Sequence, residues 1–166
     1  MPRLEHEVPK GMPESFVEAT ADELEIEVLK AGSLTLERED LTRAVEPDSC
    51  FYIANEALVR GRGAIVLPTD PPPDLAIESD YTNSSINKLA LYSALGVPEL
   101  WRYMQQQLVV YRRVEGGYEE SDRSLAFPFL PIAEVAGFIE RSYEVGQRSA
   151  VRQFRQRIKG ILEHES

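Results

Sequence analysis

Apolar positions recur along this chain at spacings that predict several short strands. Apolar and polar residues alternate at 33–40 (SLTLERED), and aromatic or β-branched residues are frequent at 49–56 (SCFYIANE), so both segments are predicted strands. A nearly continuous apolar run within 74–80 (DLAIESD) predicts a central strand that is covered on both faces. Further strands are expected at 99–106 and 107–114, and the segment GYEESDRS follows a turn at Gly116 and Gly117.

Other segments show the wider spacing of amphipathic helices. Residues 82–97 form the clearest one, with polar residues at 83–85 that can cap it, an apolar stripe from Ile86, and Gly96 to end it. A short helix is expected at 132–142 and an amphipathic helix at 147–163, whereas 14–30 is compatible with a helix in its first half and a strand in its second. The order strand, helix, strand in the middle implies a right-handed crossover and a mixed α/β sheet with helix on each face.

A length of 166 residues and an ordinary composition, 43% hydrophobic and 28% charged, predict one globular domain. The prolines and the glycine within the first 13 residues predict a loose N-terminal segment at 1–13. The domain is expected over 14–142. A C-terminal amphipathic helix is expected within 143–166.

The composition removes several classes of function. Cys50 is the only cysteine, which excludes an intrachain disulfide and a cysteine-rich zinc site, and His6 and His164 lie too near the ends for histidine chemistry in the middle. The chain has neither an apolar run of membrane-spanning length nor an apolar N-terminal stretch. We therefore expect a cytoplasmic protein with no membrane partner.

The net charge of −10 argues against a passive nucleic-acid coat, but the last segment is basic. A seam of Val151, Phe154, Ile158 and Ile161 is expected to dock on the domain body or on a second copy of the chain. The basic face beside that seam is then either simply solvated or a contact for phosphates or a partner. Its residues are Arg148, Arg152, Arg155, Arg157 and Lys159.

Candidate chemistry is confined to carboxylates and one lysine. Glu78 lies inside an apolar strand, where a charge is costly unless it is paired or bound to a cation. Asp48, Asp74 and Asp80 lie at strand boundaries, and Lys88 follows on the next helix, from which its amine can reach back over the strand end. The alternative is a half-buried structural ion pair, with Asp48 and Asp74 as turn residues.

Two or three carboxylates and a lysine are the minimal set for metal-assisted phosphodiester hydrolysis. Carboxylate oxygens suit Mg²⁺ or Mn²⁺, and the lysine can orient water or offset the charge of the transition state. Tyr92, four residues after Lys88, is expected to be core packing rather than an acid, and Cys50 and Trp101 are expected in the core.

The runs EPDSCFYI, PPPDLAIESD, NKLALYSALGVPELWRY and LAFPFLP resemble the Uma-two family, which is assigned to endonucleases of the PD-(D/E)xK, restriction-endonuclease-like fold. The resemblance covers about residues 33–131. It implies an α/β domain with a mixed central sheet flanked by helices, and a C-terminal helical tail.

The resemblance also assigns residues. It makes Asp48 and Glu78 the metal ligands and places Asp80 where the motif lysine would stand, so that Lys88 takes the role of that lysine. Asp74 matches a second PD and is a supporting residue or a further ligand. Family members begin with a hairpin and a long helix; here that region looks short. An acid such as Glu23, Glu25 or Glu27 would then have to complete the site, or the site is incomplete.

We therefore expect an endonuclease that hydrolyses DNA with Mg²⁺ or Mn²⁺, acting as a homodimer because cutting two strands requires two sites. The alternative is a catalytically inactive member of the same fold, acting as a dimeric interaction or nucleic-acid-binding module. Its support is the short N-terminal region, the acidic surface, and Asp80 in place of lysine.

Overall fold

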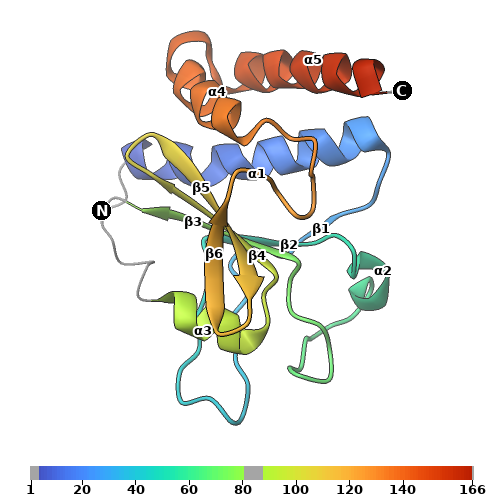
Figure 1. The fold of residues 1–166 in the computed structure, drawn as a ribbon, viewed down its shortest axis with the longest axis vertical. Helices are drawn as coiled ribbons and strands as arrows, with labels where there is room; N and C mark the ends of the chain where they lie inside the picture. The colour runs from blue at the N-terminus through green and yellow to red at the C-terminus, as the bar shows by residue number, and fades with distance from the viewer. Residues whose placement is uncertain (1–3, 81–87, 166) are drawn as a thin grey trace.

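The computed structural model describes residues 4–80 and 88–165, and a six-stranded sheet forms its centre (Figure 1). The strands lie side by side in sequence order: β1 (Leu29–Lys30), β2 (Ser49–Tyr52), β3 (Leu75–Asp80), β4 (Glu99–Met104), β5 (Gln107–Val114) and β6 (Gly117–Ser121). β3 and β4 are parallel and every other pair is antiparallel. Helix α3 (Leu89–Leu95) lies in the β3–β4 connection, which confirms the predicted strand–helix–strand unit. The predicted cap at 83–85 and Ile86 lie outside the described residues.

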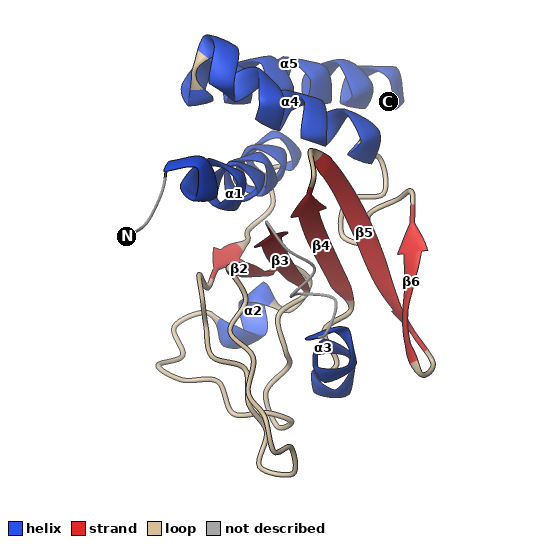
Figure 2. Cartoon of the chain, turned by 90° about the vertical axis from the view of Figure 1, so that its left-hand side faces the viewer, coloured by secondary structure: helices blue, strands red, loops and turns tan. Residues whose placement is uncertain are grey.

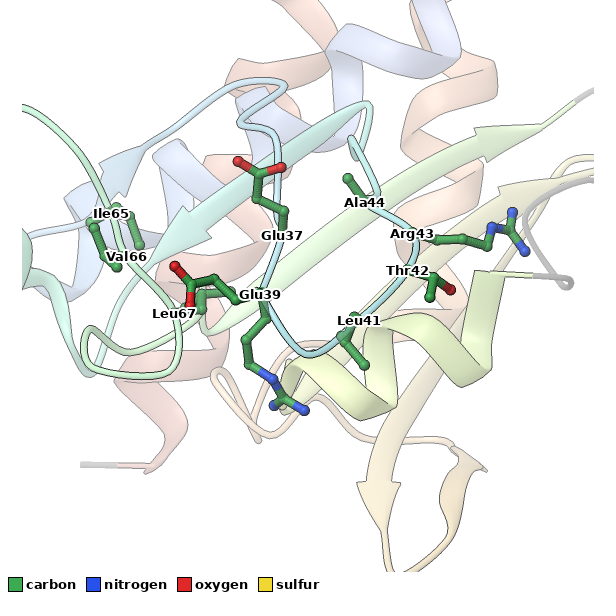
Figure 3. A pocket seen from close by; sticks show the side chains of 10 residues that line it. Glu37, Glu39, Leu41, Thr42, Arg43, Ala44, Ile65, Val66 and Leu67 are labelled. Carbon is green, nitrogen blue, oxygen red and sulfur yellow. The ribbon is translucent and has the colours of Figure 1, made fainter.

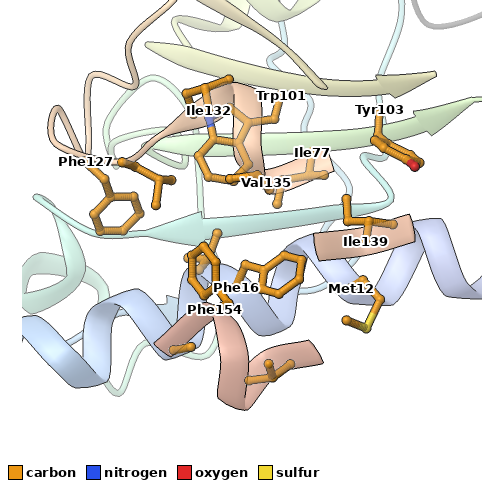
Figure 4. Close-up of a cluster of buried hydrophobic side chains, with 14 of the residues drawn as sticks. Met12, Phe16, Ile77, Trp101, Tyr103, Phe127, Ile132, Val135, Ile139 and Phe154 are labelled. Atoms are coloured by element: carbon orange, nitrogen blue, oxygen red, sulfur yellow. The ribbon is translucent and has the colours of Figure 1, made fainter. Parts of the chain in front are cut away.

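Helices cover the sheet on both faces. Figures 1 and 2 show α1 (Leu4–Leu24), α4 (Ile132–Val145) and α5 (Gln147–Glu165) on one side and α3 on the other. The larger core cluster lies under the three helices and is built around Phe16, Ile77, Trp101 and Phe154 (Figure 4). The smaller cluster lies on the α3 side and includes Cys50 and Tyr92. As predicted, Cys50 and Trp101 are core residues and β3 is covered twice.

The expectation of a loose segment at 1–13 is wrong over the residues that the structure describes there, because α1 begins at Leu4. Pro9 and Pro13 both lie inside this helix. Pro13 has no N–H to give to the carbonyl four residues earlier. The hydroxyl of Ser79, on β3, donates to that carbonyl of Pro9 at 2.6 Å instead. Burial of Val8, Met12 and Phe16 then holds the helix on the sheet.

Two predicted strands are also corrected. Residues 33–40 form no strand; Leu36 makes an isolated bridge with Val45, and both side chains are buried in the smaller cluster. The alternation of apolar residues there therefore reflects side chains that are buried in the core, in a segment that has no neighbouring strand to pair with. β2 ends at Tyr52 rather than at 56 because Asp74 binds the next backbone N–H groups, and the short helix α2 (Glu56–Val59) follows.

The C-terminal helix docks on the body of the same chain. Val151, Phe154 and Ile158 are buried, and the ring of Phe154 packs 4.5 Å from that of Phe16 between ring centres. The expected exposed basic face is only partly present, because Arg155 pairs with Asp22 and Glu23 on α1, and Arg157 pairs with Glu134 on α4.

The segment limits expected at residues 13/14 and 142/143 fall inside helices. α1 runs through the first and α4 through the second, and α1, α4 and α5 share the larger core cluster. The helices of the described residues include none that is both long enough and apolar enough to cross a membrane.

Candidate active site

Two carboxylates meet where β2 begins and β3 approaches its end. β2 and β3 are antiparallel with Ser49 opposite Ile77, so Asp48 comes beside Glu78 one position further on. The backbone N–H of Ser79 donates to Asp48 Oδ2 at 2.7 Å, which fixes that side chain against β3. Glu78 is buried and Asp48 is partly exposed. The pair therefore presents one deep and one accessible carboxylate on neighbouring strands.

Helix α3 brings two further side chains to Glu78. Lys88, which precedes the first residue of the helix, places its Nζ 3.6 Å from Glu78 Oε1, and its side chain is 34% exposed. Tyr92 lies one turn later on the same helix face, and its hydroxyl donates a hydrogen bond to the same carboxylate oxygen. Gly96 ends the helix in a left-handed conformation, with φ of 86°, and turns the chain into β4.

The environment of Tyr92 defines its chemical role. Burial, together with the nearby carboxylates of Glu78 and Asp48, raises the pKa of the phenol well above its ordinary value. Tyr92 is therefore a neutral donor at physiological pH, in agreement with its expected packing role and not with that of an acid. Its contact orients Glu78.

Asp74 lies at the other end of β3. Its carboxylate accepts hydrogen bonds from the backbone N–H groups of Ile53 and Asn55 at 2.6 and 3.0 Å, and from the side chain of Asn55. It stands four positions before Glu78, about 13 Å away along the strand at the usual rise. The structure therefore does not bring Asp74 to the other carboxylates. The carboxylate of Asp74 instead closes the turn after β2.

The remaining sequence candidates contribute nothing that the described residues show at this site. Asp80 ends β3 at a position paired with Met104, and its side chain lies outside the described atoms. Glu23 binds Arg155, and Glu27 lies in a hollow with Asp74, which precedes β3 at the opposite end of that strand from Glu78. These two of the three expected substitutes therefore lie away from Glu78.

Sequence reasoning missed Arg102. It lies on β4 directly opposite Glu78 in the parallel β3–β4 register and is only 5% exposed. The sequence signal was present: a charged residue inside the apolar run ELWRY has the same meaning as Glu78 inside its strand. Pairing these two positions required the strand register, which spacing along the chain does not give.

The donor set fits a hard divalent cation. Asp48 and Glu78 supply carboxylate oxygens from neighbouring positions at the start of β2 and on β3. Groups of three or more metal-ligating side chains are absent from the described part of the chain. Two carboxylates suffice for Mg²⁺, which commonly keeps several waters and is bound through one or two carboxylates plus a substrate phosphate.

A surface hollow lies elsewhere, between the loop around Glu37–Ala44 and residues 65–67, with a volume of about 560 Å³. Figure 3 shows the side chains that line it. None of Asp48, Glu78 and Lys88 lines it.

A second buried carboxylate, Glu99, is a packing group rather than part of the site. It begins β4, and accepts hydrogen bonds from Trp101 Nε1 at 2.7 Å and from the backbone N–H of Ala126 at 2.9 Å. Burial raises the pKa of Glu99 above its ordinary value, although these hydrogen bonds act in the opposite direction. It fastens the segment before α4 to the sheet.

A mixed six-stranded sheet with helices on both faces defines a nuclease-like α/β fold. It is similar to the crystal structure of a "putative nuclease belonging to DUF820" from Anabaena variabilis, with a TM-score of 0.53 and 18% identity over 91% of this chain and 84% of that chain. Residues 14–138 match the Uma2 family, described as "Putative restriction endonuclease", and the chain belongs to that family. No curated protein matches the chain.

Proposed function

We propose that this protein is a metal-dependent endonuclease that hydrolyses phosphodiester bonds of DNA with Mg²⁺ or Mn²⁺. The observation that carries the proposal is the convergence of Asp48, Glu78 and Lys88 from β2, β3 and the start of α3. Membership of the Uma2 family, described as "Putative restriction endonuclease", supports it.

In this proposal each side chain has a defined task. Asp48 and Glu78 hold the cation, which when bound polarises the phosphoryl oxygen and acidifies a water. Lys88 lies over Glu78 and is accessible from solvent, so it can orient that water or offset negative charge in the transition state. Tyr92 fixes the rotamer of Glu78 from within the core.

One observation favours the alternative, a catalytically inactive member that binds nucleic acid or a second copy. Lys88 and Tyr92 both engage Glu78, as they would in a structural ion-pair network. The two alternatives differ in their response to a divalent cation. A metal site binds the cation, whereas a structural ion-pair network around Glu78 does not.

The deciding experiment is cleavage of supercoiled plasmid by the wild type, Asp48→Asn, Glu78→Gln and a control, Glu119→Gln, on the exposed strand β6. We expect nicking that requires Mg²⁺ or Mn²⁺, its loss in the two site variants, and wild-type rates in the control. Calorimetry with Mn²⁺ should show the same pattern. Absence of cleavage and of Mn²⁺ binding in a folded wild type would establish the inactive alternative.

A further inference from the structure

We propose that three exposed basic side chains of α5, Arg148, Arg152 and Lys159, bind the phosphate backbone of duplex DNA beside the carboxylate pair. We call them the free basic face of α5. The proposal adds an interaction surface outside the candidate site, and it rests on the proposed function for the identity of the partner.

Positive charge is concentrated in α5. Residues 147–162 contain five arginines and lysines and no acidic residue, although the whole chain carries a net charge of −10. An acidic protein repels a polyanion over most of its surface. A nucleic acid therefore approaches this protein most favourably where basic residues are gathered, because contacts of basic residues with phosphates supply most of the non-specific affinity.

The structure divides the five basic residues of this helix into two groups. Arg155 and Arg157 are held by acids of α1 and α4. Arg148, Arg152 and Lys159 are exposed and have no carboxylate partner among the residues that the structure describes. Arg152 donates to the hydroxyl of the serine three residues earlier, at 3.0 Å, which leaves its charge uncompensated. Three charges are therefore available to an external anion.

The three available charges share one side of the helix. At about 100° per residue, positions 148, 152 and 159 lie within about 40° of one another, on the side away from the buried Phe154. They extend over about 16 Å along the helix axis at the usual rise. Phosphates of one strand follow one another at about 3.4 Å along a duplex, so the row can meet several of them.

This arrangement does not serve the stability of the helix. Arg148 lies in the first turn of α5, where the helix dipole disfavours positive charge, and that turn has no acidic residue. Arg148 and Arg152 are four residues apart, so their like charges repel each other. A bound phosphate relieves both repulsions.

The start of α5 lies at the same end of the sheet as the carboxylate pair. Tyr103 is paired with Ser79 in the β3–β4 register, one position beyond Glu78, and its hydroxyl donates to Glu140 on α4 at 2.7 Å. α4 ends soon after that residue, and α5 begins two positions further on (Figure 1). A duplex that reaches Glu78 over this end of the sheet can therefore continue along α5.

The test removes the same charge from two places. Arg148→Gln/Arg152→Gln is compared with the matched control Arg112→Gln/Arg123→Gln, and Lys159→Gln is then added to the first pair. Arg112 on β5 and Arg123 after β6 also lack a carboxylate partner among the described residues. Binding of a fluorescein-labelled 20-base-pair DNA duplex is followed by anisotropy in Ca²⁺ at several salt concentrations. KM with Mg²⁺, Mn²⁺ calorimetry and thermal unfolding are measured on the same proteins.

Each phosphate contact that is lost should flatten the slope of log Kobs against log salt by about 0.9. We therefore expect a change of about 1.8 in the double variant and about 2.7 in the triple variant, and no change in the control. KM for the duplex should rise about tenfold or more in the α5 variants. Mn²⁺ affinity and the unfolding temperature should match those of the wild type.

An unchanged salt slope in the folded triple variant would overturn the inference while leaving the nuclease intact. Equal flattening in the control would also overturn it, because net charge alone would then account for the effect. If the wild type cleaves nothing but the slope flattens only in the α5 variants, the proposed function fails and the backbone contact stands. If the wild type binds no duplex, both are overturned. Loss of binding to phosphatidylserine vesicles, with an unchanged duplex slope, would assign the face to a membrane instead.

Discussion

The phenol of Tyr92 donates a hydrogen bond to the carboxylate of Glu78, and this contact joins α3 to β3 at the end of the strand where the carboxylates meet. The same helix holds Lys88 near that carboxylate from one turn earlier. The orientation of Glu78 therefore depends on the short crossover helix as much as on its own strand.

Tyr92→Phe should separate orientation from chemistry. Removing the donor leaves a buried carboxylate oxygen with one hydrogen bond fewer, which costs about 1–3 kcal/mol of stability. We expect metal affinity or turnover to fall about 10–100-fold, as for other groups that orient metal ligands. Tyr103→Phe is the control, because Tyr103 donates to Glu140 on the opposite face. Equal effects of the two variants on turnover would contradict this role for Tyr92.

Lys88→Ala should lower turnover with little change in the unfolding temperature, because the ammonium is a partly exposed charge whose pairing contributes little to stability. Loss of one charge-stabilising donor corresponds to about 10²–10³ in kcat. Lys30→Ala on β1, where the lysine is also partly exposed and paired, is the control. A variant that unfolds early but keeps its specific activity would identify the lysine as half of a structural pair.

Asp74→Ala should destabilise the fold without affecting metal binding. Three hydrogen bonds from the turn after β2 end on this carboxylate, and the partly buried N–H groups would lose their acceptor. We expect a loss of about 1–3 kcal/mol per group left unsatisfied. Urea unfolding and Mn²⁺ calorimetry on the same sample check both halves. Weakened Mn²⁺ binding in folded protein would restore Asp74 to the metal site.

Glu99 predicts a pH dependence of stability. Because its pKa is raised in the folded state, the folded protein binds a proton that the unfolded chain has already lost as pH rises above about 4.5. The contribution of this residue to stability therefore decreases with rising pH. The free energy of unfolding in urea is measured for the wild type and for Glu99→Gln between about pH 4.5 and 7. We expect the value of the wild type to fall relative to that of the variant as the pH rises. A constant difference would rule this out.

Phe154→Ala should show that the C-terminal helix is part of the domain. Its ring is fully buried against Phe16 and Phe138, so truncation should cost about 3–5 kcal/mol. Arg152→Ala, on the exposed side of the same helix, should change stability by less than about 0.5 kcal/mol. A small effect of Phe154→Ala in chemical unfolding would show that α5 is dispensable.

The features that the sequence predicted are those with a local cause. The strand followed by a helix predicted that the amine of Lys88 can reach back over the strand end. The position of Glu78 inside an apolar run predicted that this acid is paired or binds a cation. The register between β3 and β4 is not local, so Arg102 remained unnoticed although it is the neighbour of Glu78.

The N-terminal helix was missed for a different reason. Val8, Met12 and Phe16 recur every four residues, which is a helical signal, but Pro9 and Pro13 argued against a helix. The hydroxyl of Ser79, seventy residues away in sequence, donates the hydrogen bond that the helix lacks at Pro9. Local helix propensity carries no information about such a distant contact. Similarly, 33–40 has the alternation of a strand but lacks a continuous partner strand.

The hydrogen bond between Ser79 and Pro9 has a consequence for how the chain folds. Residues 4–24 cannot complete their own backbone hydrogen bonding, so as an isolated peptide they should have little helix. The helix reaches its full stability only when β3 is in place to supply the hydroxyl, while the adjacent N–H of Ser79 holds Asp48. One residue therefore couples formation of the N-terminal helix to assembly of the carboxylate pair, which makes the folding of the two cooperative.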